Sequence, residues 1–421
     1  MHIPLRPKKA TKHWRWLDIL LMLYITVLLS TCANPADSAA GNTTGNPATS
    51  SPAQAKADAT GSAIEETKKI RLAHAQQILK GMTLDEKLGQ LIMVEYIGSR
   101  DGYDYQYTEL PAMISQQHVG GVLYQQANND FAPPYDTVSG LKGLSDQANK
   151  DAKIPLLMAI DQEGGQVTKL SSFFGPVPSA AQMAQSGDPN SVLAQGKQNA
   201  QWMAQVGINV DLAPVVDVGP VTHLLEDRQF SDNPQTVATY AGAFLDGLQQ
   251  NGTIGCIKHF PGLGTLPDDK ANDPHGHLPV DDSSMADLEA TNLAPYKQLI
   301  QKDNPAMIMT TDIITKAIDP DLPAEFSPKA INILRQEMKY DGVIITDGLY
   351  MVDNFWSLSD AAVMAISAGN DMVEGPYTAD QVAGVVTALK TALQAGTIKQ
   401  EQIDQSVQRI LMLKIQYGII K

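Results

Sequence analysis

The chain has 421 residues, of which 43% are hydrophobic, and a formal net charge of −15 at pH 7. This length suits two or three average domains or one large α/β barrel, and the apolar content is sufficient for a core. The excess of acidic residues argues against a nucleic-acid-binding surface, and the two cysteines exclude a disulfide framework and a four-cysteine zinc site.

Residues 1–32 have the pattern of a targeting segment. A basic stretch precedes the apolar run Leu17–Leu29, which is too short to cross a membrane comfortably. The run ends in Leu29-Ser30-Thr31-Cys32, which resembles a bacterial lipobox with Cys32 as the lipidated residue, although Thr31 replaces the usual Gly, Ala or Ser. The alternative is an uncleaved anchor helix with an incidental cysteine. Both readings predict a protein body outside the cytoplasm, anchored to the outer face of the cytoplasmic membrane or released from it.

Residues 33–64 are rich in Ala, Ser, Thr, Gly, Asn and Pro and have no aliphatic period. Such a segment buries too little apolar surface to offset its chain entropy, so it predicts a disordered linker. We therefore expect the fold to occupy residues 65–421.

Short apolar runs alternate with amphipathic segments throughout this region. Thr83 and Glu86 form a capping-box pattern that predicts a helix leading into the first run. The eight runs are 91–96, 119–124, 154–160, 208–216, 253–257, 306–309, 342–345 and 371–373, and helices are expected over 190–206, 234–250 and 328–338. Continuous apolar strands that alternate with helices indicate parallel strands covered on the outside. The pattern predicts a (β/α)8 barrel as a single catalytic domain.

Most of these runs end in charged or hydrogen-bonding residues. These residues are Asp161-Gln162-Glu163, Asp217, Lys258-His259, Thr311-Asp312, Thr346-Asp347 and Glu374. Because the carboxyl ends of all barrel strands meet at one rim, these side chains are expected to converge there. Each acid taken singly is also typical of a helix cap.

A polar stretch of residues 258–279, KHFPGLGTLPDDKANDPHGHLP, follows the fifth run without helical or strand period. A long loop at the end of a buried strand is a common place for functional residues, although it can also be merely solvated. Its carboxylates and histidines favour hydrolysis or group transfer, and the chain lacks a G-x-S-x-G nucleophile elbow. Asp273, His275 and His277 also allow a metal site, but two histidines in one loop are weak support for it, so no metal and no cofactor is expected.

Four stretches together resemble the β-N-acetylglucosaminidases of glycoside hydrolase family 3. They are KHFPGLG with DPHGHLP at 258–279, AIDQEGGQVTKL at 159–170, APVVDV with DRQFSDNP at 213–234, and GVIITDGLYM at 342–351. The resemblance covers about residues 70–421. It implies a β-N-acetylhexosaminidase (EC 3.2.1.52) that removes terminal β-linked N-acetylglucosamine, with peptidoglycan fragments (muropeptides) as its substrate.

The resemblance also implies roles for individual residues. Asp347 is the expected nucleophile, which forms a glycosyl-enzyme as in retaining glycosidases. His275, oriented by Asp273, is the expected general acid and base. The sugar-binding positions are Asp161, Lys169, Arg228, Lys258 and His259.

Several positions depart from the family pattern. Gln166 and Lys169 stand where arginine is usual, so one bidentate contact becomes a point charge. Leu263 replaces a histidine, Pro274 replaces a serine, and Asp312 stands where a histidine is common. The loop before Asp273 is also about four residues longer than usual, which a surface loop tolerates. These departures affect the expected substrate and loop geometry but keep the expected nucleophile.

The residues alone leave a structural alternative open for three of the expected site assignments. Asp161 could pair with Lys169 for structural reasons, Lys258 and His259 could be a buried ion pair and a core histidine, and Asp347 could cap a strand end. At the level of function, a family 3 β-glucosidase and an inactive sugar-binding lipoprotein are the alternatives. The chain stops soon after the eighth strand, which leaves no room for the C-terminal domain that gives many β-glucosidases their acid/base. We expect a monomer that binds carbohydrate and does not bind nucleic acid. Its N-terminus is expected to attach it to a membrane.

Overall fold

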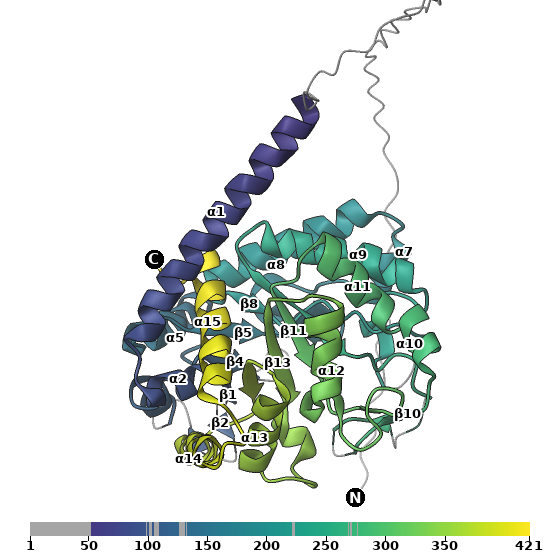
Figure 1. Cartoon of the computed structure of the whole chain (residues 1–421). Helices are drawn as coiled ribbons and strands as arrows, with labels where there is room; N and C mark the ends of the chain where they lie inside the picture. The colour runs from purple at the N-terminus through teal and green to yellow at the C-terminus, as the bar shows by residue number, and fades with distance from the viewer. Residues whose placement is uncertain are drawn as a thin grey trace, which may run out of the picture. The chain divides into compact units, whose positions relative to one another are not determined.

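Eight parallel strands close into a barrel in the order in which they occur along the chain, which confirms the predicted fold class (Figure 1). The barrel strands are β1 (Ile92–Tyr96), β4 (Gly121–Tyr124), β5 (Leu157–Ile160), β8 (Val210–Asp211), β9 (Ile254–Phe260), β11 (Met307–Thr310), β13 (Val343–Gly348) and β14 (Met372–Glu374). The last strand pairs with the first, with Ile92 opposite Val373, so the barrel has no open edge.

The computed structural model describes residues 52–421 except 98, 101–102, 105–108, 126–130, 132, 221–223, 268, 270–271 and 276. The predicted signal segment and Cys32 therefore lie outside the described residues, as does most of the predicted linker. Residues 59–421 form one compact unit.

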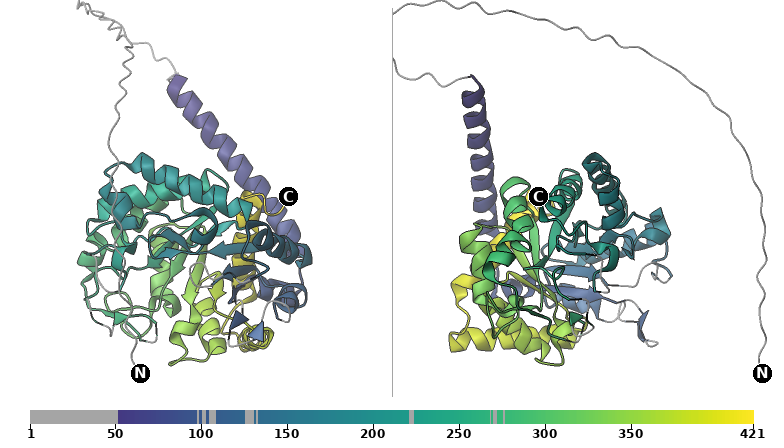
Figure 2. Two further views of the ribbon diagram at one scale, coloured as in Figure 1. Left: turned by 180° about the vertical axis from the view of Figure 1, so that it is seen from behind. Right: turned by 90° about the vertical axis from the view of Figure 1, so that its right-hand side faces the viewer.

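Helices surround the strands on the outside of the barrel (Figure 2). The helices of the described residues are α1 (Pro52–Lys80), α2 (Leu84–Gln90), α4 (Leu110–Ser115), α5 (Val138–Asp151), α6 (Ser171–Phe174), α7 (Ala180–Gln185), α8 (Pro189–Gln205), α9 (Pro234–Gln249), α10 (Met285–Ala290), α11 (Leu293–Lys302), α12 (Pro328–Asn332), α13 (Leu358–Ala368), α14 (Ala379–Ala395) and α15 (Gln400–Gln416). Short 3₁₀ segments are η1 (Glu226–Arg228), η3 (Ala324–Phe326) and η5 (Leu349–Val352), and η4 (Ile333–Glu337) is a π-helix. Two-stranded sheets pair β2 (Ser99–Arg100) with β3 (Tyr103–Asp104), β6 (Gln162–Gly164) with β7 (Val167–Thr168), and β10 (Val280–Asp281) with β12 (Ile314–Thr315).

Local sequence explains where the predicted helices begin. The Thr83 hydroxyl accepts from the Glu86 amide while the Glu86 carboxylate accepts from the Thr83 amide, so the capping box is present. Helix α8 begins after Asp188, whose carboxylate accepts from the Asn190 amide, and α9 begins after Asn233 in the same way. The third expected helix, over 328–338, is α12 followed by the π-helix η4.

Glycines set the close packing of α8 on α9. A Cβ added at Gly196 would lie 2.2 Å from the Phe244 carbonyl oxygen, and one at Gly247 would lie 2.3 Å from the Leu193 carbonyl oxygen. Both distances are far below van der Waals contact, so the two backbones approach as closely as they do only because neither position carries a side chain. Helix α9 of this pair packs against β9, which carries Lys258 and His259.

Two strands differ in length from the sequence expectation. Strand β9 continues through Phe260, so Lys258 and His259 lie in the strand rather than in the polar loop that follows it. The polar side chains at these two positions therefore mark the site, and they do not mark the end of the strand. Strand β8 covers only Val210–Asp211 of the expected run, although the Ala213 and Pro214 carbonyl oxygens still accept from the Cys256 and Lys258 amides of β9.

Helix α1 begins at Pro52 and therefore extends into the segment 33–64 that composition predicts to be a linker. Alanine is the strongest helix former, and six of the first twelve residues of α1 are alanine or lysine. Among the helices of the described residues, none has the combination of length and apolar character that a membrane crossing requires.

Candidate active site

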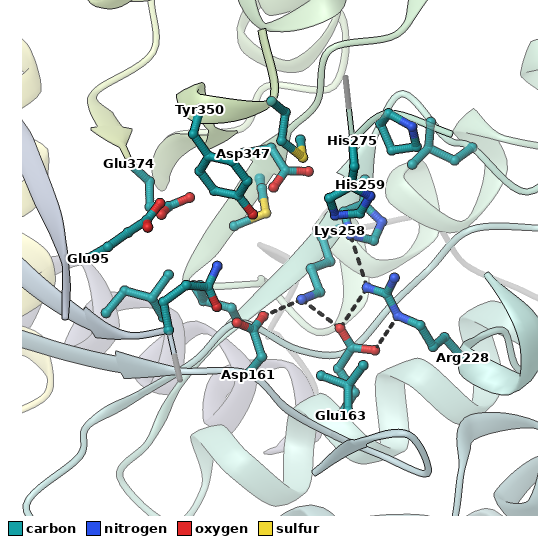
Figure 3. A pocket seen from close by; sticks show the side chains of 18 of the residues that line it. Glu95, Asp161, Glu163, Arg228, Lys258, His259, His275, Asp347, Tyr350 and Glu374 are labelled. Carbon is teal, nitrogen blue, oxygen red and sulfur yellow. Dashed lines mark hydrogen bonds and ion pairs between the residues drawn. The ribbon is translucent and has the colours of Figure 1, made fainter. Parts of the chain in front are cut away.

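The carboxyl ends of the barrel strands surround a cavity of about 860 Å³. Figure 3 shows the side chains that line it. They include Glu95 of β1, Asp161 and Glu163 after β5, Lys258 and His259 of β9, Asp347 of β13, Glu374 of β14, and Arg228, His275, Tyr350 and Lys169 from the segments between strands. Four of the six strand ends that the sequence singled out therefore contribute polar side chains to one cavity, whereas Asp217 and Thr311-Asp312 do not line it. The cavity is large enough for a small saccharide.

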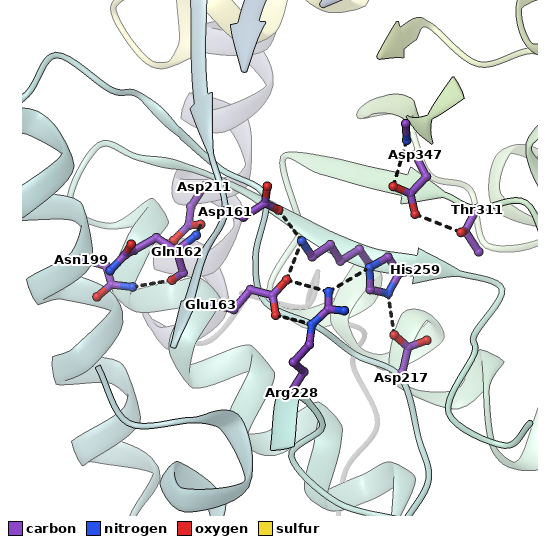
Figure 4. A network of polar contacts seen from close by, with 12 residues as sticks. Asp161, Gln162, Glu163, Asn199, Asp211, Asp217, Arg228, His259, Thr311 and Asp347 are labelled. Carbon is purple, nitrogen blue, oxygen red and sulfur yellow. Dashed lines mark hydrogen bonds and ion pairs between the residues drawn. The ribbon is translucent and has the colours of Figure 1, made fainter. Parts of the chain in front are cut away.

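Four charged side chains form an ion-pair cluster on one wall of the cavity (Figure 4). The Lys258 ammonium donates to Asp161 Oδ1 at 2.6 Å and to Glu163 Oε1 at 2.7 Å. Arg228 reaches the same glutamate through Nε at 2.8 Å and Nη2 at 2.9 Å, which is a bidentate contact. Ion pairs thus join four residues from three separate segments on this wall of the cavity.

Glu163 and Lys258 of this cluster keep their charges over a wide pH range. Burial acts to raise the pKa of Glu163, but Arg228 and Lys258 outweigh it and hold that pKa well below its usual range. Burial acts to lower the pKa of Lys258, but Asp161 and Glu163 hold it above its ordinary value. The cluster therefore offers fixed ammonium and guanidinium donors and carboxylate acceptors, which suit the hydroxyl groups of a sugar.

His259 is oriented from both sides. Its Nδ1 lies 2.7 Å from Asp217 Oδ2, and Asp217 is itself held by the Leu263 amide at 2.7 Å. Arg228 Nη2 lies 3.4 Å from His259 Nε2. Since arginine can only donate, this contact places the imidazole proton on Nδ1 and leaves Nε2 as an acceptor.

Asp347 is held by neutral donors. Its Oδ1 accepts from the Gly348 amide at 2.9 Å, and its Oδ2 accepts from the Thr311 hydroxyl at 3.0 Å. The side chain is half-buried and lines the cavity. No ion pair among the described residues involves Asp347, so its carboxylate stays available to a ligand.

The β9–β10 loop (residues 261–279) brings the predicted dyad to the cavity rim. His275 Nδ1 lies 2.9 Å from Asp273 Oδ1, and the His275 amide donates to the same oxygen at 3.0 Å. Burial acts to raise the pKa of Asp273, but these two hydrogen bonds lower it, so the aspartate is a stable partner for the imidazole. Of the described residues between 269 and 279, Pro274 and His275 line the cavity and His277 does not.

Two of the sequence alternatives concern contacts that the structure describes. Asp161 pairs with Lys258 at 2.6 Å, whereas the structural alternative gave it Lys169 as its partner. Lys169 lines the same cavity, half-buried, and burial lowers its pKa while Asp161 opposes that shift. Lys258 is indeed part of a buried ion pair, as the second alternative held, but it also faces the cavity, so both descriptions apply.

Several residues of the site were given no role by the sequence. Glu163, Asp217 and Thr311 follow barrel strands, but which partner each contacts depends on the closed barrel. Glu95 and Glu374 lie on the neighbouring strands β1 and β14 and both line the cavity. Burial and the adjacent Glu95 raise the pKa of Glu374 well above its usual range. Glu95 could have been recognised in the sequence as a charged residue inside an otherwise apolar strand.

The metal alternative for the β9–β10 loop gains no support from the geometry. Among the residues that the structure describes, no three His, Cys, Asp or Glu side chains are grouped closely enough to hold a metal ion.

Comparisons with known proteins agree with this geometry. The family model of the glycosyl hydrolase family 3 N-terminal domain matches residues 83–413. Beta-hexosaminidase LpqI of Mycobacterium tuberculosis is 31% identical over 340 residues, which are 78% of this chain and 82% of the relative.

Two solved structures have the same fold. A family 3 beta-N-acetylglucosaminidase of Paenibacillus sp. FPU-7 superimposes with a TM-score of 0.73 at 29% identity, over 80% of this chain and 63% of that one. The beta-N-acetylhexosaminidase of Beutenbergia cavernae superimposes with a TM-score of 0.67 at 30% identity, over 78% of this chain and 98% of that one. The chain is therefore a glycosidase of glycoside hydrolase family 3, of the β-N-acetylhexosaminidase type.

Proposed function

We propose that the enzyme removes terminal, non-reducing β-linked N-acetylglucosamine by a retaining mechanism in which Asp347 is the nucleophile. The observation that carries this proposal is the position of Asp347. Its carboxylate faces the cavity, is held by two neutral donors, and lies in the same cavity as donors for sugar hydroxyls. Such a carboxylate can attack the anomeric carbon and form a covalent glycosyl-enzyme.

The His275–Asp273 pair supplies the second function that this mechanism requires. In the first step, protonated His275 donates a proton to the leaving oxygen, and in the second step neutral His275 accepts a proton from water. Asp273 contacts Nδ1 at 2.9 Å, which leaves Nε2 of the same ring for the substrate. The exposed loop position gives water access for the second step.

The ion-pair cluster is the proposed binding site for the sugar hydroxyls. Asp161, Lys258, Arg228 and His259 all line the cavity. Peptidoglycan fragments are the proposed natural substrate, in keeping with the extracytoplasmic location that the N-terminal sequence predicts. The test is release of N-acetylglucosamine from purified muropeptides.

The decisive experiment is trapping of the intermediate. A 2-deoxy-2-fluoro or 5-fluoro analogue should label the enzyme, and peptide mapping should find the label on Asp347. An NMR time course should show the β anomer as the first product, because two displacements at one carbon retain the configuration. First release of the α anomer, or a label on another residue, would contradict the mechanism.

Substrate choice has its own test. Aryl N-acetylglucosaminide should be hydrolysed much faster than aryl glucoside under the same conditions. Faster cleavage of the glucoside would favour the β-glucosidase alternative, and cleavage of neither would favour a binding protein.

A further inference from the structure

Two buried acids lie behind the proposed nucleophile and have no role in the mechanism above. Asp312 follows β11 and Glu325 lies in η3, and their exposed fractions are 0% and 1%. Among the described residues, Asp312 Oδ2 and both carboxyl oxygens of Glu325 have no hydrogen-bond partner. A buried carboxylate oxygen without a donor is strongly disfavoured, so these three oxygens favour the neutral acid form of Glu325 and, although Asp312 Oδ1 lies near Thr311, of Asp312.

Thr311 connects one of these acids to Asp347. The Thr311 hydroxyl oxygen lies 3.0 Å from Asp347 Oδ2 and 3.4 Å from Asp312 Oδ1. A hydroxyl group has one proton to donate and two lone pairs that accept. Since Thr311 donates over the shorter contact to the charged oxygen of Asp347, its remaining contact to Asp312 is satisfied only if Asp312 is the donor.

We propose that Asp312 is a positioning residue: as a neutral acid it donates to Thr311, and Thr311 in turn holds the carboxylate of Asp347 in its reactive orientation. This inference rests on the proposed role of Asp347 and adds to it. It also explains why an acid is compatible with the position where the related family commonly has histidine, since both side chains offer a proton.

The surroundings of Asp312 support the neutral form. Burial, with the charge of Asp347, raises the pKa of Asp312 to about 8. Among the described residues, the charged groups that interact with it are the acids Asp347 from β13, Glu325 from η3 and Asp273 from the β9–β10 loop. When Asp312 ionises, it becomes an acceptor and competes for the single Thr311 proton, and Asp347 then loses a donor.

The test measures the rate of glycosyl-enzyme formation against pH with a dinitrophenyl N-acetylglucosaminide. This leaving group departs without a proton, so the titration of His275 does not shape the profile. In the wild type, the rate should fall on the alkaline side with an apparent pKa near that of Asp312. Asp312→Asn keeps a donor that is neutral at every pH, so its rate at pH 6 should stay within about threefold of the wild type and its alkaline fall should disappear.

Variants of Thr311 test the same chain independently of Asp312. Thr311→Val should lower kcat roughly ten- to hundredfold, the effect of one lost hydrogen bond to a charged group, with little change in KM. It should also lack the alkaline fall, whereas Thr311→Ser should retain it. The double variant Thr311→Val/Asp312→Asn should be no slower than Thr311→Val, because both changes interrupt one chain.

Asp319→Asn is the matched control. Asp319 is a buried aspartate of the same β11–α12 connection, where it accepts from the Ser327 hydroxyl at 2.8 Å. This variant should keep the alkaline fall. An unchanged profile in Asp312→Asn, or multiplicative losses in the double variant, would overturn the positioning role. If the glycosyl-enzyme is trapped on Asp347 but the Asp312 and Thr311 variants give either of these results, only the positioning role is overturned. If it is trapped on another residue, the proposed function itself is overturned.

Discussion

At the scale of single residues, two histidines of one loop differ in their surroundings. His275 contacts Asp273 at 2.9 Å and lines the cavity, whereas His277 is exposed two residues further along. The spacing in the sequence did not separate the two, except through the resemblance to a family motif. In the structure, His275, whose ring contacts Asp273, is the histidine that lines the cavity.

His275→Ala should lose roughly a hundred- to ten-thousandfold in rate on a disaccharide, because a sugar hydroxyl leaves only with a proton. The loss in the glycosylation step should be much smaller with an activated aryl glycoside, and azide should restore part of the turnover by replacing the activated water. His277→Ala is the control, and its effect should be modest and equal on both substrates. The reverse pattern in a comparison of kcat/KM values would show that His277 is the acid.

Glu325 predicts a dependence of stability on pH. Burial raises its pKa well above the usual range, with Asp312 and Asp347 adding to the shift. The folded state therefore keeps a proton that the unfolded chain releases above about pH 4.5, so this group makes stability fall as the pH rises from there. Glu325→Gln should raise the free energy of unfolding at pH 7 relative to the wild type and give a smaller or no gain at pH 4.

Urea unfolding at the two pH values measures this difference. Glu337→Gln, which changes an exposed glutamate in η4, should show no such contrast. An equal effect of Glu325→Gln at pH 4 and pH 7 would mean that the buried acid is not neutral.

At the scale of elements, α15 reaches the end of the barrel opposite the cavity. Its Lys414 is fully buried, and the ammonium nitrogen lies 2.7 Å from Gln90 Oε1 and 2.9 Å from the Gly120 carbonyl oxygen. Gln90 ends α2, which leads into β1, and Gly120 precedes β4. One side chain therefore joins the last helix to the starts of two neighbouring strands.

Lys414 should make the enzyme more stable as the pH rises above neutrality. Burial lowers its pKa from 10.5 to about 7. Between these values the folded state holds a neutral amine while the unfolded chain still binds the proton, so stability increases with pH across this window. Lys414→Met should lack that increase, and parallel curves of unfolding free energy against pH for the two proteins would contradict the assignment.

The sequence predicted most elements because local patterns define them. A capping box marks the start of α2, amphipathic patterns mark α8 and α9, and apolar runs mark the barrel strands. The limits of β9 could not be predicted, since Lys258 and His259 look like loop residues until their partners Glu163 and Asp217 are known. The burial of Asp312 and Glu325 could not be predicted either, because nothing along the chain indicates which polar residues the closed barrel covers.

At the scale of the whole molecule, the barrel is one part of a chain whose N-terminal sequence predicts export and lipid attachment. We propose that Cys32 is lipidated and that the enzyme acts at the outer face of the cytoplasmic membrane. Lipid chains contribute anchoring of about 0.8 kcal/mol per buried methylene. Cys32 lies outside the described residues, so this proposal rests on the sequence.

Cys32→Ser should abolish incorporation of labelled lipid in the native host and release the enzyme from the membrane fraction. Cys256→Ser is the control, because Cys256 is buried in β9 and cannot reach a lipid donor in the folded protein. Continued labelling of the Cys32 variant would show that the lipobox reading is wrong.

The pairing of β1 with β14 closes the barrel, and it affects when the site can form during folding. It joins position 92 to position 373, so the contact that closes the barrel spans most of the folded chain. Contacts this distant in sequence form slowly, because a long loop must be ordered before they contribute. The wall that carries Glu95 and Glu374 exists only after this last pairing. A growing chain therefore lacks this wall of the pocket until residue 374 has been synthesised.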